Sequence, residues 1–182
     1  MEENTVYTIG HSTHPVEKFI GLLEAHGIGT LVDVRTIPKS RYNPQFQQAA
    51  LKSSLRERGI VYDYIKDLGG LRRAHADSPN HGWRNSSFRG YADYMQTEVF
   101  EEALGRLMEI TSRKRTAIMC AEAVPWRCHR SLIADALLVR AIPVMDIMPD
   151  GRLSAHKMTS FAQADGTKIV YPPENPELPG IG

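Results

Sequence analysis

The segment Met119–Leu137 contains both cysteines of the chain, next to several other side chains that could carry out chemistry. Cys120 and Cys128 are candidate nucleophiles, while Glu122 and His129 are candidate acids or bases. We expect Cys128 in the first turn of a helix, where the helix field lowers the pKa of a thiol. We expect Cys120, at the end of a buried strand, to be desolvated and inert. The segment therefore predicts a catalytic centre.

Three other interpretations of this segment remain open. A strand, a cysteine-headed loop and a helix resemble the loops of cysteine phosphatases and sulfurtransferases. However, six residues separate Cys120 from Arg127, one more than in the phosphatase loop, and Glu122 would repel a phosphate. A metal site formed by Cys120, Glu122, Cys128 and His129 matches no standard zinc spacing, so we predict no metal. Two structural thiols in a tightly packed loop are the third alternative.

Polar residues also follow the earlier predicted strands. His11 and Ser12 lie between a strand and a helix N-terminus, where N–H groups bind anions, although this turn could simply cap the helix. Asp33 interrupts an apolar strand, and Arg35 follows on the same side. They could act as a base and an anion-binding group, or form a structural ion pair.

A rigid stretch, Thr36–Pro44, presents Lys39, Ser40 and Arg41 as a wall for a phosphate. His11 and His129 are expected to carry protons near neutral pH. The residues expected in catalysis are His11, Asp33, Cys120, Glu122, Cys128 and His129. The residues expected to bind the ligand are Ser12, Arg35, Ser40, Arg41, Gly69, Gly70, Arg127 and Arg130.

The stretch Leu68–Met95 is long for a connection, so we expect it to be functional or mobile. Between Arg72 and Tyr94 it has four Arg and two His against two Asp, interleaved with aromatic residues. This mixture suits a nucleotide or single-stranded nucleic acid, because bases stack on rings and arginines bind phosphates. The alternative is a solvated insertion that packs its own aromatic residues.

Short β-branched runs alternate with amphipathic helical runs. The predicted strands are Val6–Ile9, Thr30–Val34, Ile60–Ile65, Thr116–Cys120 and Pro143–Ile147. Four helices are predicted. The first begins near Pro15, and the others span Gln45–Arg58, Thr97–Thr111 and Cys128–Arg140. This alternation predicts a single-domain α/β fold with a mainly parallel five-stranded sheet, helices on both faces and a C-terminal extension.

The α/β domain is expected to span residues 1–165, and residues 166–182 to form an extended or disordered, proline-rich tail. Ligands of parallel sheets bind beyond the carboxyl ends of the strands. Because the polar residues follow strands one to four, we expect them to meet at one edge of the sheet.

Composition limits the classes of function. The chain has 182 residues, 42% of them hydrophobic and 24% charged, with a net charge of +1. This balance argues against a general polyanion binder. No apolar run is long enough to cross a membrane and the N-terminus has no signal-peptide core. We therefore expect a cytoplasmic protein without membrane contact, whose thiols are reduced.

Several of these motifs resemble one known family. The segments Thr8–Ser12, Asp33–Arg35, Pro38–Arg41, Tyr64–Gly70, Met119–Leu137 and Ser154–Ala162 are similar to the domain of unknown function 488 family. The resemblance implies an α/β fold with a shared polar site, and no particular activity. Asp146 departs from it, since many members have a histidine there.

These observations favour an enzyme that acts on a phosphate-bearing small molecule, a nucleotide or a nucleic-acid component, at the carboxyl edge of the sheet. The alternatives are a metal- or redox-active cysteine site and a non-catalytic module that binds nucleotides or RNA. The sequence indicates no particular cofactor, reaction class or oligomeric state.

Overall fold

The central sheet has the strand order β3-β2-β4-β1-β5-β6. Its strands are β1 Val6–Gly10, β2 Thr30–Asp33, β3 Val61–Tyr64, β4 Thr116–Cys120, β5 Val144–Ile147 and β6 Leu153–Ala155. Strands β1 to β5 are parallel, and β6 pairs antiparallel with β5. The computed structural model describes residues 4–173. The five predicted strands are confirmed, and β6 is an additional edge strand.

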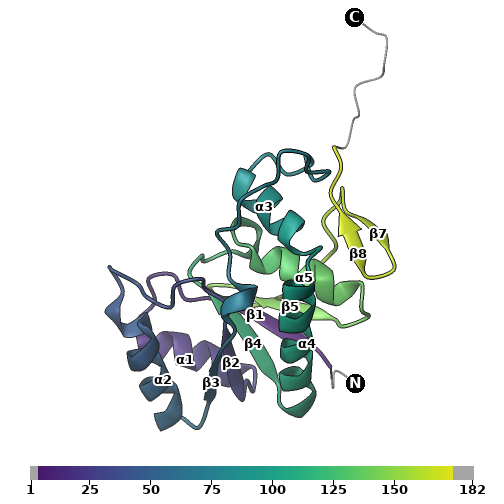
Figure 1. Ribbon diagram of the computed structural model, residues 1–182. Helices are drawn as coiled ribbons and strands as arrows, with labels where there is room; N and C mark the ends of the chain where they lie inside the picture. The colour runs from purple at the N-terminus through teal and green to yellow at the C-terminus, as the bar shows by residue number, and fades with distance from the viewer. Residues whose placement is uncertain (1–3, 174–182) are drawn as a thin grey trace, which may run out of the picture.

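Five α-helices connect or cover the strands in the described part of the chain (Figure 1). They are α1 Val16–Ala25, α2 Gln48–Glu57, α3 Ser86–Tyr94, α4 Glu98–Arg113 and α5 Arg130–Leu138. Single 3-10 turns are η1 Pro44–Phe46, η2 Lys66–Leu68 and η3 Pro125–Arg127. None of the helices within residues 4–173 is long and apolar enough to span a membrane.

Helices cover both faces of the sheet, as expected. Successive side chains of a strand point to opposite faces. Val6 and Ile118 accordingly belong to one apolar cluster, together with buried residues of α3, α4 and α5. Tyr7 and Ala117 belong to a second cluster with residues of α1 and α2. The two cores hold the parallel strands in one fixed layer, which fixes where the loops at their carboxyl ends lie.

The long stretch after β3 is more ordered than the sequence suggested. We expected a loop to about Tyr91, but α3 begins at Ser86, because Asn85 caps it by accepting from the backbone N–H groups of the first turn. The preceding loop is fixed to Asp93 of this helix. That carboxylate accepts hydrogen bonds from Ser78, Asn80 and His75 at 2.6, 2.7 and 2.9 Å. Most aromatic residues of the stretch pack within the protein.

The expected tail is also partly ordered. Strands β7 Gln163–Asp165 and β8 Lys168–Val170 form an antiparallel hairpin beside α5 (Figure 1). Tyr171 is fully buried, and its hydroxyl donates to Asp135 of α5 at 2.8 Å. This anchoring explains why the chain stays packed beyond the predicted boundary at residue 165. Residues 174–182 of the expected tail lie outside the described residues.

Candidate functional site

A pocket of about 290 Å³ lies beyond the carboxyl ends of β2, β3 and β4. Its walls come from four separate segments, which the sheet order brings together: the chain after β2, the chain after β3, the turn after β4 and the first turn of α3. The lining residues are Arg35, Thr36, Ile37, Lys39, Gly70, Leu71, Ser87, Phe88, Cys120, Ala121, Glu122, Arg127, Cys128 and His129. Ligands of parallel sheets bind at this edge.

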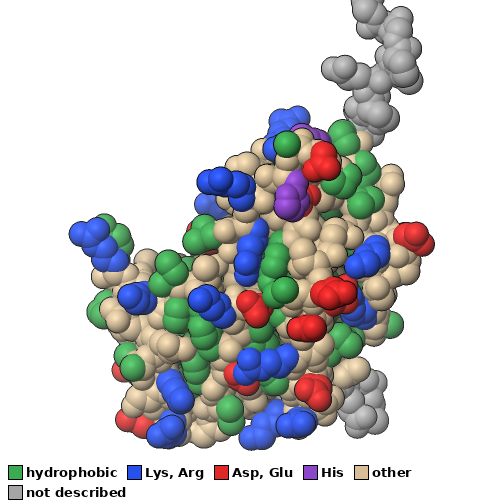
Figure 2. All heavy atoms as spheres, viewed as in Figure 1, with side chains coloured by type: hydrophobic (Ala, Val, Ile, Leu, Met, Phe, Trp, Pro, Cys, Tyr) green, Lys and Arg blue, Asp and Glu red, His purple; other side chains and the backbone are tan. Residues whose placement is uncertain are grey.

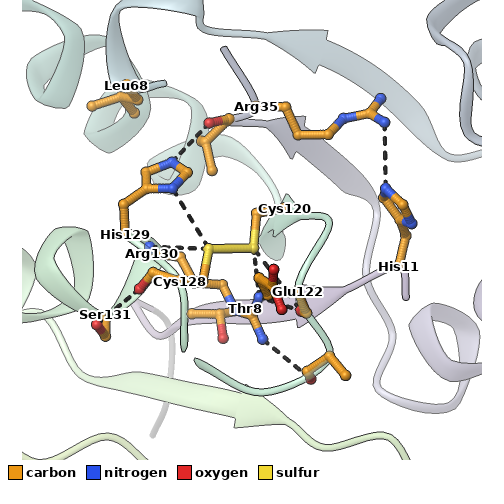
Figure 3. The surroundings of a disulfide bond; sticks show 12 residues. Thr8, His11, Arg35, Leu68, Cys120, Glu122, Cys128, His129, Arg130 and Ser131 are labelled. Carbon is orange, nitrogen blue, oxygen red and sulfur yellow. Dashed lines mark hydrogen bonds between the residues drawn. A yellow bond between two sulfur atoms is a disulfide. The ribbon is translucent and has the colours of Figure 1, made fainter. Parts of the chain in front are cut away.

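The two cysteines form a disulfide at this pocket (Figure 3). Cys120 is the last residue of β4, and Cys128 lies just before α5, so the loop between them folds back on itself. Both residues are almost fully buried, yet both line the pocket. The structure thus pairs the two sulfurs where two separate thiols were expected, because composition does not show that the loop turns them toward each other.

A buried arginine contacts the disulfide. Nη1 of Arg130 donates to Sγ of Cys120 at 2.6 Å and to the carbonyl oxygen of Glu122 at 2.7 Å. Arg130 is 0% exposed, and burial lowers its pKa to about 10, so it remains charged at neutral pH. No salt bridge joins it to a carboxylate within residues 4–173. We expected Arg130 to bind a ligand, but it lies inside the protein with its charge directed at a sulfur.

His129 occupies the other side of the disulfide. Its Nε2 lies 2.9 Å from the carbonyl oxygen of Val34, so this nitrogen carries the proton and donates it there. Nδ1 then has its lone pair toward Sγ of Cys128, at 3.5 Å. Burial lowers the pKa of His129 to about 4. The ring is therefore neutral near pH 7, which does not fit the expected role of a proton carrier in that range.

Cys128 does not lie in the helix as expected. Its backbone is extended, and α5 begins two residues later, at Arg130. The backbone N–H of Arg130 lies 3.5 Å from Sγ of Cys128, whereas the full guanidinium charge is at Cys120. The full charge of the guanidinium thus lies at Cys120, whereas the sequence placed the helix field at Cys128.

Asp33 and Arg35 form a buried ion pair. Nε and Nη2 of Arg35 donate to the two carboxylate oxygens at 2.9 and 2.7 Å, and the hydroxyl of Tyr62 adds a further bond at 2.6 Å. Asp33 is 0% exposed and does not line the pocket. This is the structural ion pair that the spacing allowed, and it positions Arg35 as a wall of the pocket.

His11 lies behind that wall. Its Nδ1 is 2.8 Å from the carbonyl oxygen of Ser12, its Nε2 is 3.5 Å from Nη1 of Arg35, and its ring stacks on Phe46. Burial lowers the pKa of His11 to about 4, so it too is neutral near pH 7. His11 supports Arg35 and does not reach the pocket.

The anion site expected at the turn after β1 is not formed. The N–H groups of His11 and Ser12 donate to the carbonyls of Cys120 and Ala121, both at 2.9 Å. Gly10 allows this contact, because a Cβ at that position would collide with the carbonyl oxygen of Glu122. The close approach that a glycine permits here is made by the cysteine loop and not by a ligand.

The structure separates the predicted site residues into two groups. Those that line the pocket are Arg35, Gly70, Cys120, Glu122, Arg127, Cys128 and His129, and those that do not are His11, Ser12, Asp33, Ser40, Arg41, Gly69 and Arg130. Sequence reasoning missed the apolar walls, Ile37, Leu71 and Phe88. No sequence signal marks the first two, since single apolar residues in loops are common. Among residues 4–173, no group of three or more His, Cys, Asp or Glu side chains could hold a metal ion.

Fold and site define an α/β protein with a cysteine pair in a pocket at the carboxyl edge of a parallel sheet. The family model described as domain of unknown function DUF488 matches residues 15–137, and the chain belongs to this family. The match includes the cysteine loop and all of α5 except its last residue. Searches of the curated proteins and of the solved structures found no significant match.

Proposed function

We propose that the protein is a thiol–disulfide oxidoreductase whose redox centre is Cys120–Cys128. The observation that carries this proposal is the hydrogen bond from the buried Arg130 guanidinium to Sγ of Cys120, at 2.6 Å. Arg130 also donates to the carbonyl oxygens of Glu122 and Ala123 and so holds the loop, but a structural disulfide does not require its additional contact with the sulfur. A cation there is expected where that sulfur must become a thiolate, because an opposite charge and a hydrogen bond both lower the pKa of a thiol.

The charge balance around Arg130 favours the reduced state. In the disulfide form the guanidinium is buried without a salt-bridged carboxylate among the described residues. The negative charges of Asp146 and Glu122 partly offset the cost of burying this cation. Reduction would add a negative charge in direct contact with it, as the Cys120 thiolate. A disulfide whose reduced form is stabilised in this way has a high reduction potential. It is therefore a strong oxidant, which other thiols readily reduce.

The two cysteines have different roles in this proposal. A substrate thiolate attacks Sγ of Cys128, the S–S bond breaks, and Cys120 leaves with the bonding electron pair as a thiolate held by Arg130. A second substrate thiolate then attacks the mixed disulfide and releases Cys128, which takes up a proton. His129 assists this step, because its Nδ1 faces that sulfur and accepts a hydrogen bond from the new S–H group. Two electrons pass from the substrate dithiol to the protein, and the substrate leaves as a disulfide.

Disulfide transfer to a reporter dithiol tests this proposal. The oxidised protein should convert one equivalent of a dithiol peptide to its disulfide, and mass spectrometry should show two hydrogens gained by the protein. Cys120→Ser and Cys128→Ser should transfer nothing while keeping the circular dichroism of the wild type. No transfer by the wild type, or transfer by either serine variant, would contradict the proposal.

A second candidate is an enzyme that acts on a phosphate-bearing ligand, as the sequence favoured. The observation in its favour is the charge of the pocket wall, which has Lys39 and Arg127 against the single acid Glu122. Arg35 contributes little to this charge because Asp33 neutralises it. Calorimetry with mononucleotides should show binding that is lost in Lys39→Ala and Arg127→Ala. Equal affinity in the variants and the wild type would remove these cations from such a site.

A further inference from the structure

The mouth of the pocket has an apolar rim. Ile37 follows β2 and is 57% exposed, and Leu71 follows β3 and is 77% exposed. Both line the pocket. Two large, exposed apolar side chains from separate loops at one opening indicate a surface that binds a partner.

Leu71 adds a second observation, independent of its exposure. Its φ is 58°, in the left-handed region that non-glycine residues avoid. The backbone thus holds a leucine in a strained conformation and points most of its side chain to solvent. Neither feature stabilises the isolated chain. Strained backbone conformations of this kind are frequent at functional sites, where a contact between the side chain and a ligand can offset the cost of the strain.

The charge at the mouth indicates the chemistry of the partner. Lys39 and Arg127 take part in no salt bridge within residues 4–173, and Glu122 is the only acid on the wall. Figure 2 shows basic, acidic and hydrophobic side chains interspersed on the face of the molecule that it draws. A partner that covers the rim should therefore be acidic as well as partly apolar.

The depth of the sulfurs limits the shape of the partner. Cys120 and Cys128 are 2% and 4% exposed, and the pocket of about 290 Å³ holds only one or two side chains. A flat protein face cannot bring a thiol to these sulfurs. A cysteine on an extended segment can enter the pocket while its neighbours contact Ile37 and Leu71.

We infer that the substrate of the redox centre is a polypeptide dithiol, presented as an extended acidic segment that docks on the apolar rim. This inference rests on the proposed function and names its class of substrate. Leu71 is then a specificity-determining residue, which binds the residues beside the attacking cysteine. It does not touch the sulfurs itself.

The test compares three dithiol peptides with dithiothreitol as reductants of the full-length oxidised protein. The peptides have the same two cysteines and one leucine, flanked by acidic, neutral or basic residues. The rate of reduction is followed by acid quenching and mass spectrometry. The acidic peptide should react about tenfold faster than the basic one, and the difference should shrink at high salt.

Leu71→Gly is the decisive variant. It should slow reduction by the acidic peptide at least about fivefold more than it changes reduction by dithiothreitol, so the ratio of the two rates is the readout. It should also raise Tm by about 2 °C, because glycine relieves the positive φ. Leu153→Gly makes the same substitution at an exposed leucine of β6, away from the pocket, and should leave both rates unchanged.

The outcomes separate the inference from the proposed function. Suppose that dithiothreitol reduces the disulfide, but that all three peptides react equally fast and Leu71→Gly changes none of their rates. The proposed redox centre is then supported, the docking inference is wrong, and the substrate is a small thiol. If no reductant opens the disulfide of the folded protein, both fail.

Discussion

Replacing Arg130 by methionine should raise the pKa of the Cys120 thiol. The side chain is 0% exposed and makes a charge-assisted hydrogen bond to Sγ at 2.6 Å. Such a bond contributes about 1.5–3 kcal/mol. One pKa unit corresponds to about 1.4 kcal/mol, so Arg130→Met should raise the pKa by about 1–2 units. In the two-electron couple the same energy lowers the reduction potential by about 30–60 mV.

The assay is the pH dependence of iodoacetamide alkylation of the reduced protein, with each cysteine read separately by mass spectrometry. In the wild type, Cys120 should react at lower pH than Cys128, because the guanidinium stabilises its thiolate. Arg130→Met should move only the Cys120 profile to higher pH.

Two control variants separate this effect from a general loss of structure. Arg130→Lys keeps the charge, so its Cys120 profile should stay close to that of the wild type. Arg140→Met removes an arginine beyond the other end of α5, where it pairs with Glu101, and should leave both profiles unchanged. An unchanged Cys120 profile in Arg130→Met, or earlier alkylation of Cys128 in the wild type, would refute the reasoning.

Three further predictions concern the surroundings of the site. Asp33→Asn leaves Arg35 buried without its counter-charge, so the free energy of unfolding in urea should fall by about 3–5 kcal/mol; a change below about 1 kcal/mol would contradict the buried pair. Gly10→Ala places a methyl group against the carbonyl of Glu122, so Tm should fall, whereas an unchanged Tm would mean that the loop yields freely. Burial lowers the pKa of His129 from 6.5 to about 4, so the unfolded chain binds more protons between these values and stability should drop by about 3 kcal/mol as pH falls through this window. Urea unfolding at several pH values should show a smaller drop in the free energy of unfolding for His129→Gln than for the wild type. Equal dependence on pH in the two proteins would exclude this histidine as the cause.

Much of the fold could be predicted because its signals are local. Strands β1, β2 and β4 are short apolar runs between amphipathic helices, and their alternation implies a parallel sheet. The strands β6, β7 and β8 have three residues each, too few for a period to be recognised. Helix α3 was missed because its apolar residues are mixed with polar ones, and Asn85 caps it without a following hydrophobic run.

The sequence predicted which segments form the site better than it predicted the roles of their residues. The cysteine loop was identified because reactive residue types are concentrated there, and the pairing of Asp33 with Arg35 was one of two interpretations of their spacing. The direction of Arg130 could not be predicted. As the first residue of α5 it has the composition of an anion-binding group, and only the packing of the helix against β4 turns its charge inward to Cys120. That one contact reverses the roles expected for the two cysteines.

The measurement that tests the account most directly is the reduction potential of the Cys120–Cys128 pair, from equilibration with glutathione redox buffers and mass spectrometry of the quenched protein. If Arg130 stabilises the reduced state as proposed, the potential should lie above about −200 mV, in the range of protein disulfides that are passed to substrates. A potential below about −300 mV is typical of structural disulfides and would contradict a redox centre at this site.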